Sequence, residues 1–300
     1  MTITITPMEP HRPDFAGLVS NIDLRKPLRD PERDAIEAGM DRYAVLVFRG
    51  QDITNEQQLA FSRCFGELEP AYSVPGDNVQ VGRIPSEIND VSNLDRDNKP
   101  LPRDDRQRLF QLGNLLWHSD SSYKPVPAKY SMLLARAIPD RGGDTQFADM
   151  RAAWDTLDRE TQELVRNMIC EHSRLFSRGE LGFSFSAEEQ VKFAPVQQRL
   201  VRRHPVTGRL SLYLSSHGGA IVGWPLPEAR ALLRELTEHA TQRERVYTHK
   251  WRPFDMVMWD NRVTMHRARR YDHTKVRDMR RTTLTAEVSS LEQAPPPLAH

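Results

Sequence analysis

Residues 114–123 read NLLWHSDSSY, and the pair His118 and Asp120 inside this stretch bears most directly on the fold. In an extended strand the side chains of residues i and i+2 point to the same side, so an imidazole and a carboxylate face one point. On a helix the same side chains lie roughly 200° apart and cannot share a ligand. The spacing therefore predicts a strand whose two side chains face one metal ion, with a hydrogen-bonded surface pair as the alternative.

A second histidine, distant in sequence, would complete such a site, and His266 is our candidate. It follows an apolar, strand-like run at 256–259. Two histidines and one carboxylate occupy one face of an octahedral iron ion, which leaves three positions for substrate-derived ligands and dioxygen. On the residues alone, His204 and His217 remain competitors for the same role.

Arg277 and Arg281 lie four residues apart at the start of a strand-like run, 281–288. In an extended chain both side chains point the same way, about 13 Å apart. Two guanidinium groups on an inward face are costly unless each meets an anion. The alternative is a solvated basic edge or a nucleic-acid patch, because residues 262–281 contain seven arginines. The formal net charge of +1 and the lack of interleaved aromatic residues argue against nucleic acid.

The composition is that of an ordinary globular chain of 300 residues, with 42 Lys+Arg, 41 Asp+Glu and 38% hydrophobic residues. This balance argues against a polybasic membrane binder or a disordered chain. Only 7 of the 42 basic residues are Lys, a bias that GC-rich coding also produces. We interpret Cys64 and Cys170 as buried thiols in a reducing compartment. Because no signal peptide or transmembrane run is visible, we expect a cytoplasmic protein.

Capping signals and apolar runs place the elements of the fold. Helices are predicted at 30–43, 54–66, 149–170 (as one or two helices) and 225–242. Strands are predicted at 44–48, 130–137, 210–214, 255–259 and 281–288. Regular strand–helix alternation and a Gly-rich phosphate loop are both absent from the sequence. We therefore predict a mainly β fold with helices (α+β), such as a jelly roll with helices outside its core.

Five blocks of sequence, in one order, give a more specific indication than any single motif. They span residues 45–70, 114–123, 138–157, 239–271 and 278–284. Together they resemble the Fe(II)/2-oxoglutarate-dependent dioxygenases of the taurine dioxygenase superfamily, and are most similar to the 2,4-dichlorophenoxyacetate dioxygenase branch. The resemblance implies a double-stranded β-helix (jelly-roll) core with flanking and inserted helices. It also implies Fe(II) as cofactor, with 2-oxoglutarate and O2 as co-substrates.

The family pattern, carried over residue by residue, implies a metal site and a co-substrate site. It makes His118, Asp120 and His266 the iron ligands. Arg277 matches the arginine that pairs with the far carboxylate of 2-oxoglutarate, and Thr145 matches the hydroxyl that helps to hold the same carboxylate.

The same pattern implies a substrate site. Arg281 matches the arginine that receives the acidic group of the substrate. Asn114, Ser121 and Lys99 stand where the phenoxyacetate branch has polar or basic residues near the substrate carboxylate, and His204 is a further candidate. For Asn114, Ser121 and Lys99, ordinary structural roles (a strand-edge amide, a hydroxyl, a solvated lysine) stay open.

The implied reaction is hydroxylation of a small carboxylate, such as the aryloxyacetate 2,4-dichlorophenoxyacetate. Cleavage of its ether would give a phenol and glyoxylate, with succinate and CO2 from 2-oxoglutarate. Related iron halogenases lack the carboxylate found here as Asp120, so its presence favours hydroxylation. A sulfonate or sulfate-ester dioxygenase is the alternative, because Arg281 could bind a sulfonate equally well. From other classes, a zinc-dependent hydrolase with the same ligand set and a nucleic-acid-binding protein remain open.

We expect residues 1–300 to form a single catalytic domain. In it, about 71–113 would be a mobile loop over the site, about 149–200 a mostly helical insertion and 290–300 a flexible tail. The phenoxyacetate branch places a further basic residue after the first block, but residues 71–82 contain no Lys or Arg, so a different acid is conceivable. The expected partners are a small acidic substrate and other copies of the chain (a dimer, trimer or tetramer), with no nucleic acid and no membrane.

Overall fold

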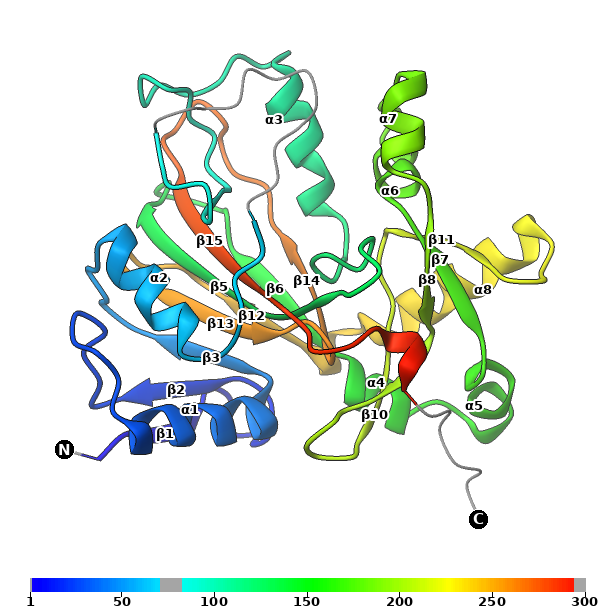
Figure 1. Cartoon of the computed structure of the whole chain (residues 1–300), viewed down its shortest axis with the longest axis horizontal. Helices are drawn as coiled ribbons and strands as arrows, with labels where there is room; N and C mark the ends of the chain where they lie inside the picture. Colours follow the sequence, from blue (N-terminus) through cyan, green and yellow to red (C-terminus); the bar gives the residue numbers. More distant parts are fainter. Residues whose placement is uncertain (1, 71–82, 294–300) are drawn as a thin grey trace.

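The fold was analysed in a computed structural model, which describes residues 2–70 and 83–293 (Figure 1). The described helices are α1 (Asp30–Tyr43), α2 (Asn55–Arg63), α3 (Arg106–Gln111), α4 (Met150–Asp155), α5 (Arg159–Val165), α6 (Arg174–Glu180), α7 (Ala187–Lys192) and α8 (Leu226–Ala240), with 3₁₀ turns η1 (Leu112–Leu115), η2 (Arg243–Arg245) and η3 (Ser290–Glu292). The described strands are β1 (Thr4–Pro7), β2 (Gly17–Ser20), β3 (Val45–Phe48), β4 (Asn89–Asp90), β5 (Ala128–Ala137), β6 (Thr145–Asp149), β7 (Ile169–His172), β8 (Val196–Arg199), β9 (Val201–Arg203), β10 (Leu210–Leu212), β11 (Gly218–Ile221), β12 (Val246–His249), β13 (Met256–Asp260), β14 (Thr264–Ala268) and β15 (Asp278–Thr285). The predicted mixed α+β class is confirmed.

A large sheet of seven strands, in the order β1-β2-β3-β13-β5-β15-β4, forms the frame of the molecule. Its central strand, β13, pairs with β3 on one side and β5 on the other, so that Val257 lies opposite both Val47 and Leu133. All five residues of β13 are buried. A strand covered on both faces reads as a continuous apolar run, which is how the sequence of β13 begins.

The inner face of the large sheet packs against a small sheet of three strands, β12-β6-β14. Val45, Val257 and Trp259 of the large sheet share one buried cluster with Phe147 of β6 and Tyr247 of β12. Strand residues alternate between the faces of a sheet, so this set fixes which side chains point between the two sheets.

Helices α1 and α2 cover the opposite, outer face of the large sheet (Figure 1). Leu46, Met132 and Met258 alternate with the inner-face residues and pack with Ile36 of α1 and Phe61 of α2. The capping box at Thr54 and Gln57, which the sequence indicated, begins α2.

A third cluster lies behind the small sheet and joins it to the rest of the helices. Met265 of β14 and Ala148 of β6 pack there with Ala153 of α4 and Leu236 of α8. The short sheet β11-β7-β8 continues this layer beside α6 and α8, on the right of the view in Figure 1. His266, the residue after Met265, consequently points to the other face, between the two main sheets.

The middle of the chain differs from expectation in its strands. The segment 149–200, predicted to be mostly helical, contains the four helices α4 to α7 and also the strands β7 and β8. The helix predicted to run to about Cys170 ends at α5, and Ile169–His172 is a strand that pairs with β11 and β8. Cys170 and His172 alternate with partly exposed neighbours, which is a strand pattern.

Two further expectations fail at the surface. Cys170 is buried as expected, but Cys64 is exposed, since it is the residue that follows the last turn of α2. The tail is not free from residue 290 onward. Ser290 is buried, its hydroxyl accepts the N–H of Arg199, and it also lies 2.5 Å from Oε1 of Gln198. Residues 71–82 and 294–300, which belong to the predicted mobile loop and tail, lie outside the described residues. None of the helices in the described part is long and apolar enough to cross a membrane.

A buried ion cluster fixes the end of β13. Nη2 of Arg262 lies 2.7 Å from Oδ2 of Asp260, and Nε lies 2.9 Å from Oδ1. Nε2 of His204 lies 3.2 Å from the same carboxylate. Burial alone would raise the pKa of Asp260, but Arg262 and His204 outweigh it and hold that pKa well below its usual range. The cluster therefore stabilises the fold as long as Asp260 is ionised.

Replacing Asp260 with Asn should lower the free energy of unfolding by about 3–5 kcal/mol, because Arg262 would stay buried without its counter-ion. Since the folded pKa of Asp260 is depressed, the difference between wild type and Asp260→Asn should be full above about pH 5 and shrink as the pH falls further. Denaturant unfolding at several pH values measures both effects. The exposed Asp34→Asn is the control, and an equal loss in both variants would contradict the assignment.

Candidate active site

A pair of backbone hydrogen bonds brings the two predicted histidines face to face. The N–H of His118 donates to the carbonyl of His266 (3.0 Å), and the N–H of His266 donates to the carbonyl of His118 (2.8 Å). This antiparallel bridge joins the extended segment after η1 to β14. Directly opposed residues in such a pair project to the same face, and their ring centroids lie 4.2 Å apart.

Asp120 completes a group of three possible metal ligands with His118 and His266. The ligand atoms of the three buried residues all lie within 4.8 Å of one another, and the described residues hold no second such group. Nε2 of His118 lies 3.8 Å from Oδ1 of Asp120, and Nε2 of His266 lies 3.8 Å from Oδ2. Nδ1 of His118 lies 2.8 Å from the carbonyl of Leu116, which selects the tautomer with a free lone pair on Nε2. Two imidazoles and one carboxylate are a donor set suited to Fe(II).

The carboxylate of Asp120 is oriented by neighbours that the sequence analysis did not single out. The hydroxyl of Ser131 donates to Oδ2 of Asp120 (2.8 Å), and Nδ2 of Asn261 donates to that hydroxyl (3.0 Å). Oδ1 of Asn261 also accepts the backbone N–H of Asp120 (3.1 Å). Such supporting hydrogen bonds fix ligand geometry. Ser131 lies in an apolar strand run and carries no signal in sequence.

The protonation states in this group suit metal binding. Burial lowers the pKa of His118 to about 4 and holds that of His266 well below its usual range, so both rings are neutral near pH 7. For Asp120, burial acts to raise the pKa, but Arg281 and the two histidines outweigh it and lower the pKa to about 2. Neutral imidazole and ionised carboxylate are the ligand forms.

The ligand group opens into a cavity of about 780 Å³ between the two main sheets, which we call the central cavity. Five strands of the two sheets contribute a lining residue: Leu133 from β5, Thr145 from β6, Trp259 from β13, His266 from β14 and Arg281 from β15. The volume suits a small organic molecule together with a co-substrate.

The walls of the central cavity are strongly basic. Neither Asp nor Glu is among its described lining residues, whereas six arginines are. These are Arg103, Arg108, Arg269, Arg270, Arg277 and Arg281. A cavity with one sign of charge concentrates ligands of the other sign, so this arrangement favours anions.

Arg277 is a buried cation without an anionic partner in the part of the chain that the structure describes. Its guanidinium donates to the carbonyls of Val91 and Gly143, each at 3.4 Å, and lies 5.4 Å from the ring centroid of Tyr271. Its backbone N–H donates to Oδ1 of Asn93 (2.8 Å), which holds the segment in place. Burial lowers the pKa of Arg277. An unpaired buried guanidinium is costly, so the site fits a ligand carboxylate.

Thr145 faces the same cavity with its hydroxyl already oriented. Nε1 of Trp251 donates to Oγ1 of Thr145 (3.0 Å). An indole N–H can only donate, so the oxygen of Thr145 accepts here and its own proton is available to an anion. The sequence pointed to Thr145 but gave no indication of Trp251.

Arg281 bridges the metal group and the cavity. Its Nη1 lies 2.5 Å from Oδ1 of Asp120, while its buried Nε has no hydrogen-bond partner among the described residues. The side chain therefore anchors one edge on the ligand carboxylate and keeps donors for a second anion.

Of the three other residues predicted to lie near the substrate carboxylate, only one lines the central cavity. Asn114, in η1, lines the central cavity. The hydroxyl of Ser121 donates instead to Oε2 of Glu69 (2.7 Å), and Lys99 is exposed in a turn where Oδ1 of Asp95 accepts its backbone N–H. Neither residue is part of the described lining.

The two competing histidines also lie outside the ligand group. His204 belongs to the ion cluster at Asp260, where its Nδ1 lies 3.1 Å from the backbone N–H of Thr207. The structure therefore does not bring His204 to the central cavity. His217 stacks edge-on against His118, with a centroid separation of 6.1 Å, and its Nδ1 lies 2.9 Å from the hydroxyl of Ser177.

Comparison with known proteins identifies the family. Residues 4–283 match the family model "Taurine catabolism dioxygenase TauD, TfdA family". The chain belongs to this family.

Individual relatives agree with this assignment. The chain is 44% identical over 289 residues to an alpha-ketoglutarate-dependent 2,4-dichlorophenoxyacetate dioxygenase of Cupriavidus pinatubonensis, a match that covers 94% of this chain and 98% of the relative. It is 36% identical to a (S)-phenoxypropionate/alpha-ketoglutarate-dioxygenase of Sphingobium herbicidovorans, with 92% and 93% covered. A crystal structure of AAD-2 in complex with Mn(II) and N-oxalylglycine superposes with a TM-score of 0.89 at 54% identity, with 98% and 100% covered.

The chain is therefore a 2-oxoglutarate-dependent dioxygenase, an oxidoreductase that uses Fe(II). The residues alone left a zinc-dependent hydrolase open as another function class, and this result excludes it. The arginine run 262–281 does not form one basic surface for nucleic acid either. Arg262 is buried in the ion cluster, and Arg267 stacks 4.5 Å from the ring centroid of Trp117.

Binding of Mn(II) should depend little on pH between 8 and 6, because the pKa of His118 is already near 4 and that of His266 is lowered too. Two histidines of ordinary pKa would weaken the metal about 15-fold over that range, since both must lose a proton. Isothermal titration at the two pH values tests this. A loss of Mn(II) affinity close to about 15-fold would show that burial does not lower the pKa of the two rings as described.

Proposed function

We propose that this dioxygenase hydroxylates an aryloxyacetate, such as 2,4-dichlorophenoxyacetate, and so releases a phenol and glyoxylate. The observation that carries the proposal is the pair of arginines, Arg277 and Arg281, that line one basic cavity together with the metal-ligand candidates His118 and His266. Two cationic anchors suit two carboxylates, one from 2-oxoglutarate and one from the substrate. The relatives that act on 2,4-dichlorophenoxyacetate and phenoxypropionate support an aryloxy acid as the substrate.

His118, Asp120 and His266 would hold the iron through two Nε2 atoms and one carboxylate oxygen. The protein keeps both rings neutral by burial, so no proton has to leave before the metal binds. Iron with 2-oxoglutarate and dioxygen supplies the oxidising chemistry, in which the co-substrate becomes succinate and CO2.

Arg277 and Thr145 would bind the far carboxylate of 2-oxoglutarate. Arg277 offers buried donors without a competing protein carboxylate, and Thr145 offers a hydroxyl whose oxygen is already used by Trp251. Both groups are fixed before the ligand arrives, which lowers the entropic cost of binding.

Arg281 would receive the substrate carboxylate beside the metal, with Asn114 as a second polar contact. An aryloxyacetate held by its carboxylate presents its methylene carbon to the reacting centre, because only that carbon lies between the carboxylate and the ether oxygen. Hydroxylation there creates a hemiacetal, which releases the phenol and leaves glyoxylate. The protein's contribution is to position this carbon. Ser121, Lys99 and His204 have no place in this scheme.

The two facing sheets would form the double-stranded β-helix expected for the family, with residues 1–300 acting as one catalytic domain. The site lies between the sheets, where strands from both contribute side chains. This arrangement supports a rigid scaffold for the metal ligands.

His118→Ala and Asp120→Ala should each abolish succinate formation from 2-oxoglutarate while leaving the far-ultraviolet circular dichroism spectrum unchanged. Each variant removes one of only three ligands. The exposed His11→Ala is the control and should keep full activity. Turnover that persists in either ligand variant would contradict the assignment of the metal site.

Arg277→Ala should raise the KM for 2-oxoglutarate about 10- to 100-fold, the effect of losing hydrogen bonds to a charged group. Arg281→Ala should raise the KM for the aryloxyacetate by a similar factor and change that for 2-oxoglutarate less. Arg280→Ala is a matched control, because Arg280 lies next to Arg281 but is bound to Asp278 and Asn55. Reversed effects would show that the two roles are exchanged.

The substrate class needs its own measurement. Succinate release should be fastest with aryloxyacetates, slower with aryloxypropionates and slowest with taurine and alkyl sulfate esters. Phenol and glyoxylate should appear in a 1:1 ratio with succinate if the ether is cleaved as proposed. A sulfonate or sulfate ester as the best substrate would overturn the proposed substrate and leave the reaction class intact.

A further inference from the structure

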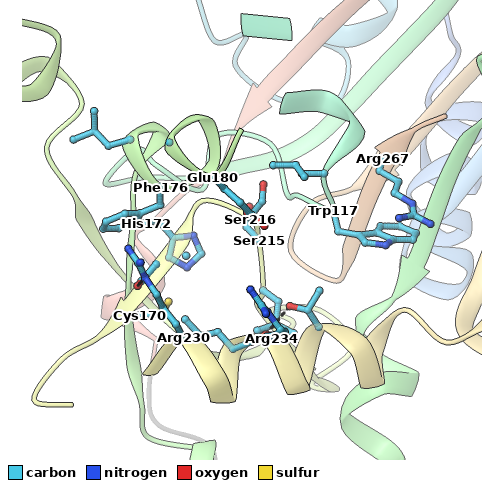
Figure 2. A pocket seen from close by; sticks show the side chains of 18 of the residues that line it. Trp117, Cys170, His172, Phe176, Glu180, Ser215, Ser216, Arg230, Arg234 and Arg267 are labelled. Atoms are coloured by element: carbon cyan, nitrogen blue, oxygen red, sulfur yellow. Dashed lines mark hydrogen bonds between the residues drawn. The ribbon is translucent and has the colours of Figure 1, made fainter. Parts of the chain in front are cut away.

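A second cavity, of about 590 Å³, lies between α6 and α8 and contains none of the metal ligands (Figure 2). We call it the α6–α8 cavity. It shares Leu115 and Leu116 with the central cavity, so this short segment before His118 forms a wall between the two. Helix α6 also separates them, since Phe176 and Gly179 line the α6–α8 cavity whereas Leu181 lines the central one.

The inner end of the α6–α8 cavity contains an unsatisfied polar side chain. His172, on β7, is fully buried, and neither of its ring nitrogens has a hydrogen-bond partner in the described part of the chain. Burial lowers the pKa of His172 to about 3, so the ring is neutral and offers one donor and one acceptor. A buried polar group without partners is costly, and one that lines a cavity suits a ligand atom.

A pair of glycines lies at this end of the cavity. A Cβ atom on Gly218 would lie 3.0 Å from Sγ of Cys170 and 3.5 Å from Nε2 of His172. A Cβ on Gly219 would lie only 2.2 Å from the ring of Phe176. A side chain at either position would collide with these neighbours, so glycine allows Cys170 and Phe176 to pack against β11 beside the histidine.

The entrance of the cavity is basic. Arg230 and Arg234 lie one turn apart on the face of α8 that lines it, and Arg267 lies across from them beside Trp117 (Figure 2). Nε of Arg230 donates to the carbonyl of Gly219 (3.4 Å), which aims the rest of its guanidinium. Arg234 has no hydrogen bond or ion pair to any described residue. A pair of guanidinium groups at this spacing suits a carboxylate.

Two glutamates, Glu180 and Glu238, also line the cavity, and both are exposed. Neither forms an ion pair with a described residue, and neither neutralises the three arginines. The rest of the wall is apolar, with Trp117, Phe176 and Leu233 among its members. Three cations against two carboxylates leave the cavity net positive, and its apolar wall favours a ligand with a hydrocarbon or aromatic body.

We propose that the α6–α8 cavity is a second binding site, for a small carboxylic acid with an apolar body. Its carboxylate would pair with Arg230 and Arg234. Its body would lie along Trp117 and Phe176, toward His172. The site is independent of the metal ligands and of Arg281.

Titration of the full-length chain with 4-fluorophenylacetate, followed by fluorine nuclear magnetic resonance, tests the proposal. In an Arg277→Gln, Arg281→Gln background, which removes both proposed carboxylate anchors from the central cavity, one saturable site should remain. Adding Arg230→Gln and Arg234→Gln to that background should weaken this site at least about tenfold, as expected for losing charge-assisted hydrogen bonds. Adding Arg243→Gln, an exposed arginine outside the cavity, should change nothing. An equal affinity in both combinations would overturn the proposal.

Gly179→Leu gives a second, independent variant that should fold. A Cβ atom there meets no atom within 4 Å, so the added side chain should fill the cavity without displacing its walls. It should abolish the remaining site in the Arg277→Gln, Arg281→Gln background, with an unchanged melting temperature or a higher one. Binding that survives Gly179→Leu, or acetate binding as tightly as 4-fluorophenylacetate, would also overturn the proposal. Failure of the aryloxyacetate activity would not affect these measurements.

Discussion

The two backbone hydrogen bonds between His118 and His266 are the constraint on which the site depends. They join residues that are 148 positions apart in sequence, and they oppose them in an antiparallel bridge. Asp120, two residues after His118, completes the ligand group, although the predicted strand is reduced to the single bridge at His118 and Asp120 already lies in a turn. The metal geometry is thus set by main-chain hydrogen bonds, which are rigid, while side-chain contacts such as that of Ser131 only refine it.

Because this backbone pairing is rigid, the protein can hold arginines without a matching number of anions beside His118 and His266. Arg277 is buried without a carboxylate partner in the described chain, and Arg281 shares a single carboxylate with the metal group. In an ordinary core this arrangement would be strongly unfavourable. It is tolerated here because β15 is held by its long pairing with β5, and because a ligand of opposite charge removes the cost on binding. The folded state is therefore less stable than it would be with paired cations, and binding is correspondingly stronger.

The sequence predicted the parts of the site that depend on spacing and failed where partners are distant. His118 and Asp120 were predictable because strand alternation is local. His204 could not be excluded, since its partner Asp260 lies 56 positions away and no local pattern announces the pair. Ser121 has a φ of 53°, so the chain turns there and its side chain leaves the strand pattern toward Glu69. Helix and strand positions were right where caps or apolar runs were clear, but Ile169–His172 has too few residues for its strand periodicity to stand out from the helices before it.

The arginine run between residues 262 and 281 shows why composition alone could not distinguish binding groups from background. Arg280 and Arg281 are neighbours on β15, yet alternation sends one toward Asn55 of α2 and the other into the central cavity. Arg262 is held in a buried ion cluster, and Arg267 stacks on Trp117 at the edge of the α6–α8 cavity. Each arginine takes its role from its position in the fold and from the charge or the ring that it meets there. A count of basic residues, or a net charge of +1, contains neither of these facts.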